Sequence, residues 1–283
     1  MKVKTVQIDA DVEEVLRAAK LEGNTLTLQS QLDRAMYVKV NKLLDLIGFK
    51  WNRKAQSHIG RGDSADKLRE GLSDGKVIDE KKTYQFFETP DGLADQMASL
   101  AQISPGHRVL EPSAGRGAII RAIQRQCPAL KVIFACELSS YMASNLADLD
   151  IEQFLQPKDD KSKYCQVIVS CGDFLQVNKK YDRIVMNPPF MAGQDCDHVK
   201  HAYDLLLPGG NLVAIMSPSW LSNESKKFKD FRKWYKSLKD NGYASTPVDL
   251  PEGTFKDSGT NVCTVMVVLS KPMSPSHPLN ACT

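Results

Sequence analysis

The segment from Tyr181 to Phe190 constrains the fold more than any other part of the chain. Its first half carries the apolar run Ile184–Met186, which is typical of a buried parallel strand. Two prolines follow almost at once, and because proline cannot donate to a strand ladder they must end the strand. Asn187 therefore lies at the carboxyl end of a strand, the edge at which open α/β sheets bind ligands. The segment predicts an α/β fold with a site beside Asn187.

An amino group on an aromatic ring is a ligand that such an edge would suit. Its nitrogen is a poor nucleophile because the lone pair is delocalised into the ring. Two acceptors against its N–H bonds, the Asn187 side-chain oxygen and the Pro188 carbonyl, would favour pyramidal geometry, while Phe190 could stack on the ring. A turn that ends a strand beside a core phenylalanine is the alternative interpretation, and the neighbouring segments decide between the two.

Three earlier strand-like runs also end in acids. They cover residues 108–111, 132–137 and 166–173 and end at Glu111, Glu137 and Asp173. After Glu111 comes a glycine turn, which lets a ligand approach the backbone closely. Glu137 lies 20 residues after Gly117, where doubly wound folds place a carboxylate that binds ribose. Acids at strand ends can be structural caps, but four polar strand ends in succession favour a binding edge.

The remaining segments complete such a fold. Thr89-Pro90 is a helix start, with proline at the first turn. Further helices are expected at 118–126, 197–207 and 225–238, a loop at 191–195, a fifth strand at 211–216, and closing strands at 248–250 and 262–270. Phe255, between the closing strands, is a candidate second aromatic for a target base. His198 and His201 have no third ligand nearby, so no metal site is expected.

The series resembles the S-adenosylmethionine-dependent N6-adenine DNA methyltransferases in Thr89-Pro90, Glu111-Pro-Ser-Ala-Gly-Arg-Gly117, Glu137, Asp173 and Asn187-Pro-Pro-Phe190. The motif order is like that of their gamma group. The resemblance covers residues 84–270 and implies a Rossmann-like class I methyltransferase, with five parallel strands and an antiparallel closing hairpin. It implies that a base swings out of the duplex.

The resemblance also implies the site residues. S-adenosylmethionine would be bound by Thr89, Pro90, Glu111, Ser113, Gly115, Gly117, Glu137, Leu138, Asp173, Phe174 and Asn187. In that set, Glu137 would bind the ribose and Asp173 the adenine amino group of the cofactor. The target base would be received by the catalytic segment Asn187, Pro188, Pro189 and Phe190.

Two departures from the family pattern leave alternatives open. Gamma-type enzymes usually carry a large target-recognition domain after the catalytic core, whereas 67 residues follow Met216 here. The motif's aromatic residue is Phe190 rather than tyrosine. Similar motifs occur in enzymes that methylate amino groups of ribosomal RNA or a glutamine of release factors, and a catalytically idle DNA-binding relative is a further alternative. The Thr89-Pro90 element favours DNA as the substrate and partner.

The first 80 residues are expected to form a small, basic and mainly helical domain. Helices are expected at 9–20, 30–47 and 63–72, with a strand-like segment at 49–59. Between residues 30 and 61, seven basic residues stand against two acidic ones. DNA contacts are assigned to Lys50, Trp51, Arg53 and Lys54, with Phe49 nearby, because aromatic rings and cations together bind bases and phosphates. Core aromatics with solvated lysines are the alternative.

Composition sets the remaining limits. The chain of 283 residues is 42% apolar and 25% charged, with a formal net charge of +3, so basic surface has to be local. Its seven cysteines form no CxxC pair, which favours reduced core residues. No signal segment or membrane span is expected, and we predict a cytoplasmic protein of a bacterium, phage or mobile-element host. The methyltransferase domain is expected at 81–271, followed by a disordered tail at 272–283.

Overall fold

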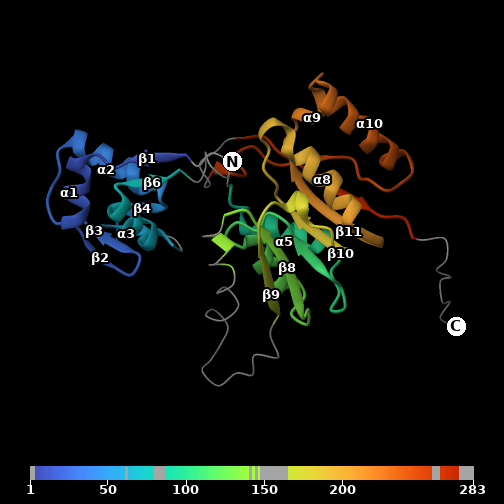
Figure 1. Cartoon of the computed structure of the whole chain (residues 1–283), viewed down its shortest axis with the longest axis horizontal. Helices are drawn as coiled ribbons and strands as arrows, with labels where there is room; N and C mark the ends of the chain where they lie inside the picture. The colour runs from blue at the N-terminus through green and yellow to red at the C-terminus, as the bar shows by residue number, and fades with distance from the viewer. Residues whose placement is uncertain are drawn as a thin grey trace. The chain divides into compact units, whose positions relative to one another are not determined.

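The computed structural model describes residues 4–60, 63–79, 87–139, 142–143, 146, 165–256 and 262–273. The chain divides into two compact units, Met1–Phe86 and Phe87–Thr283. Figure 1 draws the first in blue to cyan and the second in green to red. The division lies six residues after the boundary expected at residue 80. Each unit is described by itself below.

A seven-stranded sheet forms the framework of the second unit, in the order β12-β13-β11-β10-β7-β8-β9. Five strands are parallel: β7 (Val109–Glu111), β8 (Val132–Glu137), β9 (Gln166–Cys171), β10 (Tyr181–Met186) and β11 (Leu206–Met216). Strand β13 (Val265–Ser270) is antiparallel to β11, and β12 (Val248–Asp249) is antiparallel to β13. The predicted mostly parallel sheet with an antiparallel closing pair is confirmed.

Helices cover the two faces of this sheet. Because successive strand residues point to opposite faces, Val185 packs with helices α5 (Asp91–Leu100) and α6 (Ala118–Gln126). Its neighbours Ile184 and Met186 pack with α8 (Gln194–Leu205) and with the pair α9 (Ser219–Ser222) and α10 (Lys226–Asp240). In α10, Phe231 and Tyr235 are buried, as expected for an amphipathic helix. Two short 3-10 helices, η2 (Phe174–Gln176) and η3 (Met191–Gly193), follow β9 and β10.

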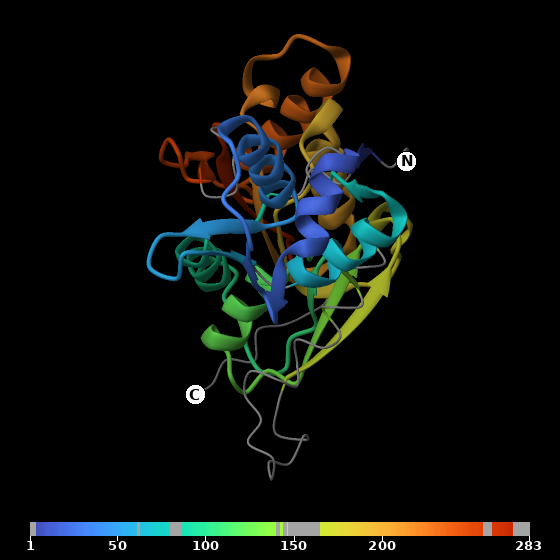
Figure 2. The same ribbon diagram turned by 90° about the vertical axis from the view of Figure 1, so that its left-hand side faces the viewer.

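The first unit is an α+β structure, which corrects the prediction of a mainly helical domain (Figure 2). Its helices α1 (Ala10–Ala18), α2 (Arg34–Leu46) and α3 (Ser64–Asp74) fall where the sequence places them. A four-stranded antiparallel sheet runs in the order β2-β3-β5-β4, formed by Lys20–Glu22, Thr25–Thr27, Ser57–Gly60 and Phe49–Asn52. Strands β1 (Thr5–Gln7) and β6 (Lys76–Ile78) form a second pair. The three-residue strands are too short to show alternation in sequence.

The cysteines, the lengths of the helices and the carboxyl-terminal tail were also predicted from the sequence. Cys127, Cys136, Cys165 and Cys196 are buried, as expected for core cysteines, whereas Cys171 and Cys263 are exposed. Across the ranges that the structure describes, every helix is too short or too polar to cross a bilayer. The tail expected at 272–283 falls outside the described residues from 274 onward.

Candidate active site

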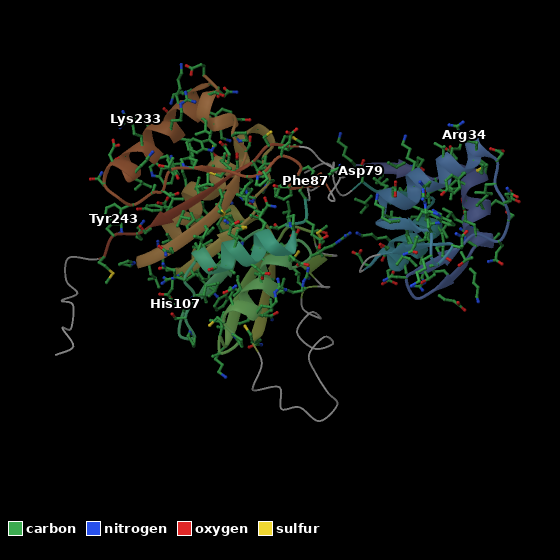
Figure 3. The ribbon with its side chains drawn as sticks, turned by 180° about the vertical axis from the view of Figure 1, so that it is seen from behind. Arg34, Asp79, Phe87, His107, Lys233 and Tyr243 are labelled. Atoms are coloured by element: carbon green, nitrogen blue, oxygen red, sulfur yellow. The ribbon has the colours of Figure 1, made fainter. Side chains whose placement is uncertain are left out.

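The polar strand ends predicted from sequence share one edge of the sheet. Strand β7 ends at Glu111 and β8 at Glu137, while Asp173 comes two residues after β9 and Asn187 follows β10 directly. Because these strands are parallel, their carboxyl ends lie along a common edge. At the opposite edge of the sheet, where the amino ends of the strands lie, β7 begins two residues after His107. Figure 3 shows His107 and Phe87 on opposite sides of the unit.

Asn187 is held in one orientation by the segment that begins the second unit. Its Nδ2 donates to the Phe87 carbonyl and to the Thr89 hydroxyl, each at 3.1 Å. A carbonyl can only accept, so the nitrogen must face Phe87 and the oxygen must face away. Within the described ranges, the Asn187 oxygen has no donor in the protein. The site therefore presents an oriented, half-buried acceptor.

Thr89 and Pro90 position the Asn187 amide at the start of α5. Thr89 is buried, with 6% of its surface exposed. Pro90 precedes α5, and its carbonyl accepts from Ala94 at 2.9 Å. The helix start therefore fixes the hydroxyl that binds the Asn187 amide. The resemblance assigns Thr89 to the cofactor; the structure adds its contact with the Asn187 amide.

The glycine turn after β7 is tied to the end of β8. Gly115 and Gly117 adopt φ values of 51° and 77°, a region that costs side-chain-bearing residues energy. The two oxygens of the buried Glu137 carboxylate accept from the backbone N–H groups of Gly115 at 2.7 Å and Ser139 at 2.8 Å. Glu137 thus fixes the shape of the turn. Its contact with the ribose stays a prediction. Ser113 is half-buried in the same turn.

Glu111 is a buried acid at the same edge. It is 2% exposed, and within the described ranges its Oε2 has no hydrogen-bond partner. Burial, and secondly the negative charge of Glu137, raises the pKa of Glu111 well above its usual value. A buried carboxyl oxygen without a hydrogen-bond partner is costly unless a ligand pairs with it. A ligand that carries positive charge, close to the backbone of the glycine turn, would fit this position.

The end of β9 supplies an exposed carboxylate. Asp173 begins η2, where its Oδ1 accepts from Leu175 at 2.9 Å. Its neighbour Phe174 is buried and packs in the core with His198 and His201, at ring distances of 5.4 and 4.9 Å. Phe174 therefore anchors the turn at Asp173 to the core. Leu138, after β8, is 49% exposed, as a side chain available to a ligand must be.

The remaining residues of the tetrapeptide follow the amide. Pro188 is buried, and Pro189 and Phe190 are half-buried. Phe190 packs partly against the core cluster that includes Leu93 and Phe255. Phe255 itself is only 2% exposed. Its assignment as a second stacking aromatic is wrong for this structure, because core packing covers the ring.

The segment after Phe190 is ordered by two contacts that the sequence did not reveal, whereas a loop was expected there. Lys227 from α10 donates to the Ala192 carbonyl at 2.9 Å and to Asp197 at 2.6 Å. Gly193 has φ 69°, and a Cβ there would lie 2.9 Å from the Phe228 ring. Glycine is therefore required where α10 packs closely against the segment.

Asp195 links the first turn of α8 to the end of β11 through its buried carboxylate. It is 1% exposed, and its Oδ2 accepts from Ser217 after β11 at 2.9 Å, while its Oδ1 accepts from Cys196 at 3.0 Å. The only sequence signal was an acid near the amino end of a helix, a common capping position. Burial raises the pKa of Asp195 to about 6 and lowers the pKa of His198, on the same helix, to about 4.

These two groups predict a pH-dependent difference in stability. A raised folded-state pKa at Asp195 stabilises the folded protein as the pH falls through about 6 toward its usual pKa of 3.8. The lowered pKa of His198 acts in the opposite direction, because its stabilisation is lost as the pH falls from 6.5 to about 4. Asp195→Asn removes the first contribution. When the pH is lowered from 7 to 4, we expect the unfolding free energy of the variant to fall by about 2 kcal/mol relative to that of the wild type.

Urea unfolding at the two pH values measures this difference. His198→Gln serves as the control, because it should change the wild-type pH dependence in the opposite direction. A variant Asp195→Asn with the wild-type pH dependence would contradict the account of the buried carboxylate.

In the first unit, the candidate DNA contacts lie on β4 and its turn. Lys50, Trp51, Arg53 and Lys54 are exposed, whereas Phe49 is fully buried in the core. Phe49 is therefore a core residue and does not contribute to a surface. Among the described residues, no cluster of three or more His, Cys, Asp or Glu side chains has the arrangement needed to hold a metal ion.

Comparison with known proteins agrees with this geometry. The model of a family described as the methyltransferase small domain matches residues 93–244, more than half of the chain. This range includes β7 to β11, the glycine turn and the tetrapeptide. None of the curated proteins gives a significant match.

Solved structures share the fold at low sequence identity. A modification subunit of a proposed type I restriction enzyme from Vibrio vulnificus is 16% identical with a TM-score of 0.52, over 85% of this chain and 54% of that chain. A chain of a type I R-M system is 18% identical with a TM-score of 0.51, over 66% and 42%. A proposed class I S-adenosylmethionine-dependent methyltransferase from Listeria monocytogenes is 14% identical with a TM-score of 0.50, over 77% and 71%. The chain thus spans about half or less of the two type I chains.

Proposed function

Because the chain belongs to the methyltransferase small domain family, its cofactor is S-adenosylmethionine, and we propose that it methylates the N6 amino group of adenine in DNA. The observation that carries the proposal is the orientation of Asn187. Its amide nitrogen is engaged by Phe87 and Thr89, which leaves the oxygen to accept from an incoming N–H bond. An exocyclic amino group has the two N–H bonds that this oxygen and the Pro188 carbonyl would receive.

The residues at the sheet edge fit the cofactor. Glu111 is a buried acid whose Oε2 has no partner among the described residues, and the left-handed backbone of Gly115 and Gly117 carries no side chain that would keep a ligand away. Asp173 has an exposed carboxylate after β9, which lies two strands from β7 in the sheet. These groups would hold the cofactor, with Glu137 at the ribose and Asp173 at the adenine amino group. When bound, S-adenosylmethionine supplies a methyl group that its positively charged sulfur already activates.

The protein's own contribution is then mainly positioning. Asn187 and Pro188 would hold the amino nitrogen so that its lone pair points at the methyl group, and Phe190 would stack on the ring. A base outside the duplex loses its stacking energy, a few kcal/mol, which contact with Phe190 offsets in part. Holding two reactants in the correct geometry supplies much of a barrier's reduction, so no strong general base is required.

DNA is the proposed substrate because of the Thr89-Pro90 element. In the N6-adenine DNA methyltransferases that the motif series resembles, this element precedes the glycine turn. Here its hydroxyl binds the catalytic amide, so the two motifs form one site. The names of two solved chains with the same fold refer to type I restriction systems, which is compatible with DNA modification but shows the fold alone.

Methyl transfer to different polymers tests the proposal. The purified chain is incubated with methyl-labelled S-adenosylmethionine and either unmethylated duplex DNA, structured RNA or a release factor. We expect label in DNA, lost in Asn187→Ala. Label in RNA alone would move the assignment to amino groups of RNA, and label in none of the three, despite cofactor binding, would contradict the proposed function.

A further inference from the structure

The β4–β5 hairpin of the first unit carries a supported aromatic ring at its surface. Trp51 is 40% exposed, although Phe49, two residues earlier on the same strand face, is fully buried. The Trp51 ring meets the buried His58 ring edge to face, with centroids 5.1 Å apart and an interplanar angle of 64°. Core packing therefore explains Phe49 but leaves much of the Trp51 ring exposed.

Helix α2 contacts the His58 ring against which Trp51 packs. His58 is fixed by a 2.9 Å contact between its Nε2 and the Asn41 Oδ1, and the Tyr37 ring lies 6.4 Å from it. Trp51 thus rests on a cluster built from both the hairpin and α2. Little side-chain freedom remains to be lost when a flat ligand binds, and a ring ordered in advance binds at lower entropic cost.

Four cations on α2 and on the hairpin turn lack acidic partners. Arg34 and Lys42 are on the exposed side of α2, and Arg53 and Lys54 form the hairpin turn (Figure 2, light blue). Within the described ranges, none of these four cations forms an ion pair. Lys50 is paired with Asp45 at 3.0 Å. Among the described residues of the unit, most other cations are paired with acids, namely Arg17, Lys20, Lys39, Lys67 and Arg69.

We propose that this surface, Trp51 with Arg34, Lys42, Arg53 and Lys54, binds a DNA strand by stacking an unpaired base on Trp51 and placing phosphates against the cations. Exposed aromatic rings beside cations are the combination that single strands bind. In a closed duplex the faces of the bases are covered, so the ligand is an unpaired segment. The identity of the strand as DNA rests on the proposed function.

The expected effects follow from the two kinds of contact. Loss of one base stack weakens binding by about tenfold, and a smaller ring retains part of it. Each cation that contacts a phosphate of a single strand adds about 0.7 to the slope of log affinity against log salt concentration. Removing Arg53 and Lys54 should therefore lower the magnitude of that slope by about 1.4.

Fluorescence anisotropy with the full chain measures both effects. The probes are a labelled single DNA strand of about 20 nucleotides, longer than one stacking site requires, its duplex and the matching RNA strand. The variants are Trp51→Ala, Trp51→Phe and the pair Arg53→Gln with Lys54→Gln. Lys20→Gln with Lys76→Gln is the matched control, because it removes the same charge from β2 and β6. Circular dichroism of each variant checks that the fold is kept.

We expect Trp51→Ala to bind the single strand about tenfold more weakly, with Trp51→Phe in between and the control close to the wild type. Binding of Trp51→Ala within twofold of the wild type, or an equal loss in the control pair, would overturn the proposed surface. Preference for the RNA strand would overturn its assignment to DNA. Methylation of DNA with no effect of the Trp51 variants would sink this inference alone, whereas Trp51-dependent binding without methylation would sink only the proposed function.

Discussion

Asn187→Ala is expected to lower kcat/KM for methyl transfer by about 100- to 1000-fold, the cost of removing one positioned polar group from a reacting centre. The alanine cannot accept from the amino group, so the nitrogen lone pair is no longer directed at the methyl group. Cofactor affinity should fall far less, because the glycine turn and its acids are unchanged. Single-turnover rates and calorimetric titration with the cofactor separate the two effects.

Changes to the partners of Asn187 test its orientation. Asn187→Asp keeps an oxygen toward the substrate but places a second oxygen against the Phe87 carbonyl, so it should also be inactive. Thr89→Val removes one of the two acceptors and should slow transfer by up to about tenfold, while Thr89→Ser should restore it. An Asn187→Ala enzyme with the wild-type rate would contradict the role of the amide.

Glu137→Gln is expected to weaken cofactor binding by about 10- to 100-fold, equivalent to about 1–3 kcal/mol for an unsatisfied buried group. The carboxylate accepts from Gly115 and Ser139 with its two oxygens. A glutamine has one oxygen, and its amino group would face an N–H donor. The glycine turn would then lose its fixed shape, and the cofactor would lose the ribose contact proposed for Glu137.

Calorimetric titration with S-adenosylhomocysteine measures this loss. Lys131→Gln, just before the opposite end of β8, is the matched control and should bind as the wild type does. Thermal unfolding without ligand shows how much of the loss comes from the fold. Unchanged affinity in Glu137→Gln would contradict the connection between the carboxylate and the turn.

Long apolar strands explain why the second unit could be predicted from sequence. Strands β8 and β10 have the predicted bounds, because prolines, glycines and acids end their apolar runs sharply. The edge that carries Glu111, Glu137, Asp173 and Asn187 follows from that topology. The resemblance implied five parallel strands and an antiparallel closing pair, whereas the order of the strands in the sheet comes from the structure.

Contacts between distant residues could not be predicted in the same way. Asn187 and Phe87 are 100 positions apart, and no local pattern shows that their backbone and side chain meet. Asp195 was assigned to a loop because its burial depends on Ser217, beyond the next strand. Phe255 was assigned to the target base because an aromatic residue in a glycine-containing loop has no periodicity to indicate its burial.

Identification of the methylated nucleoside tests the central claim most directly. DNA treated with the protein and S-adenosylmethionine is digested to nucleosides, which are separated and identified by mass spectrometry. We predict N6-methyladenine, absent when Asn187→Ala is used. N4-methylcytosine would keep the amino-group role of Asn187 and contradict the assignment to adenine. Methylation at a ring carbon or a ring nitrogen would contradict the account itself, because those atoms lack the two N–H bonds that the site is built to receive.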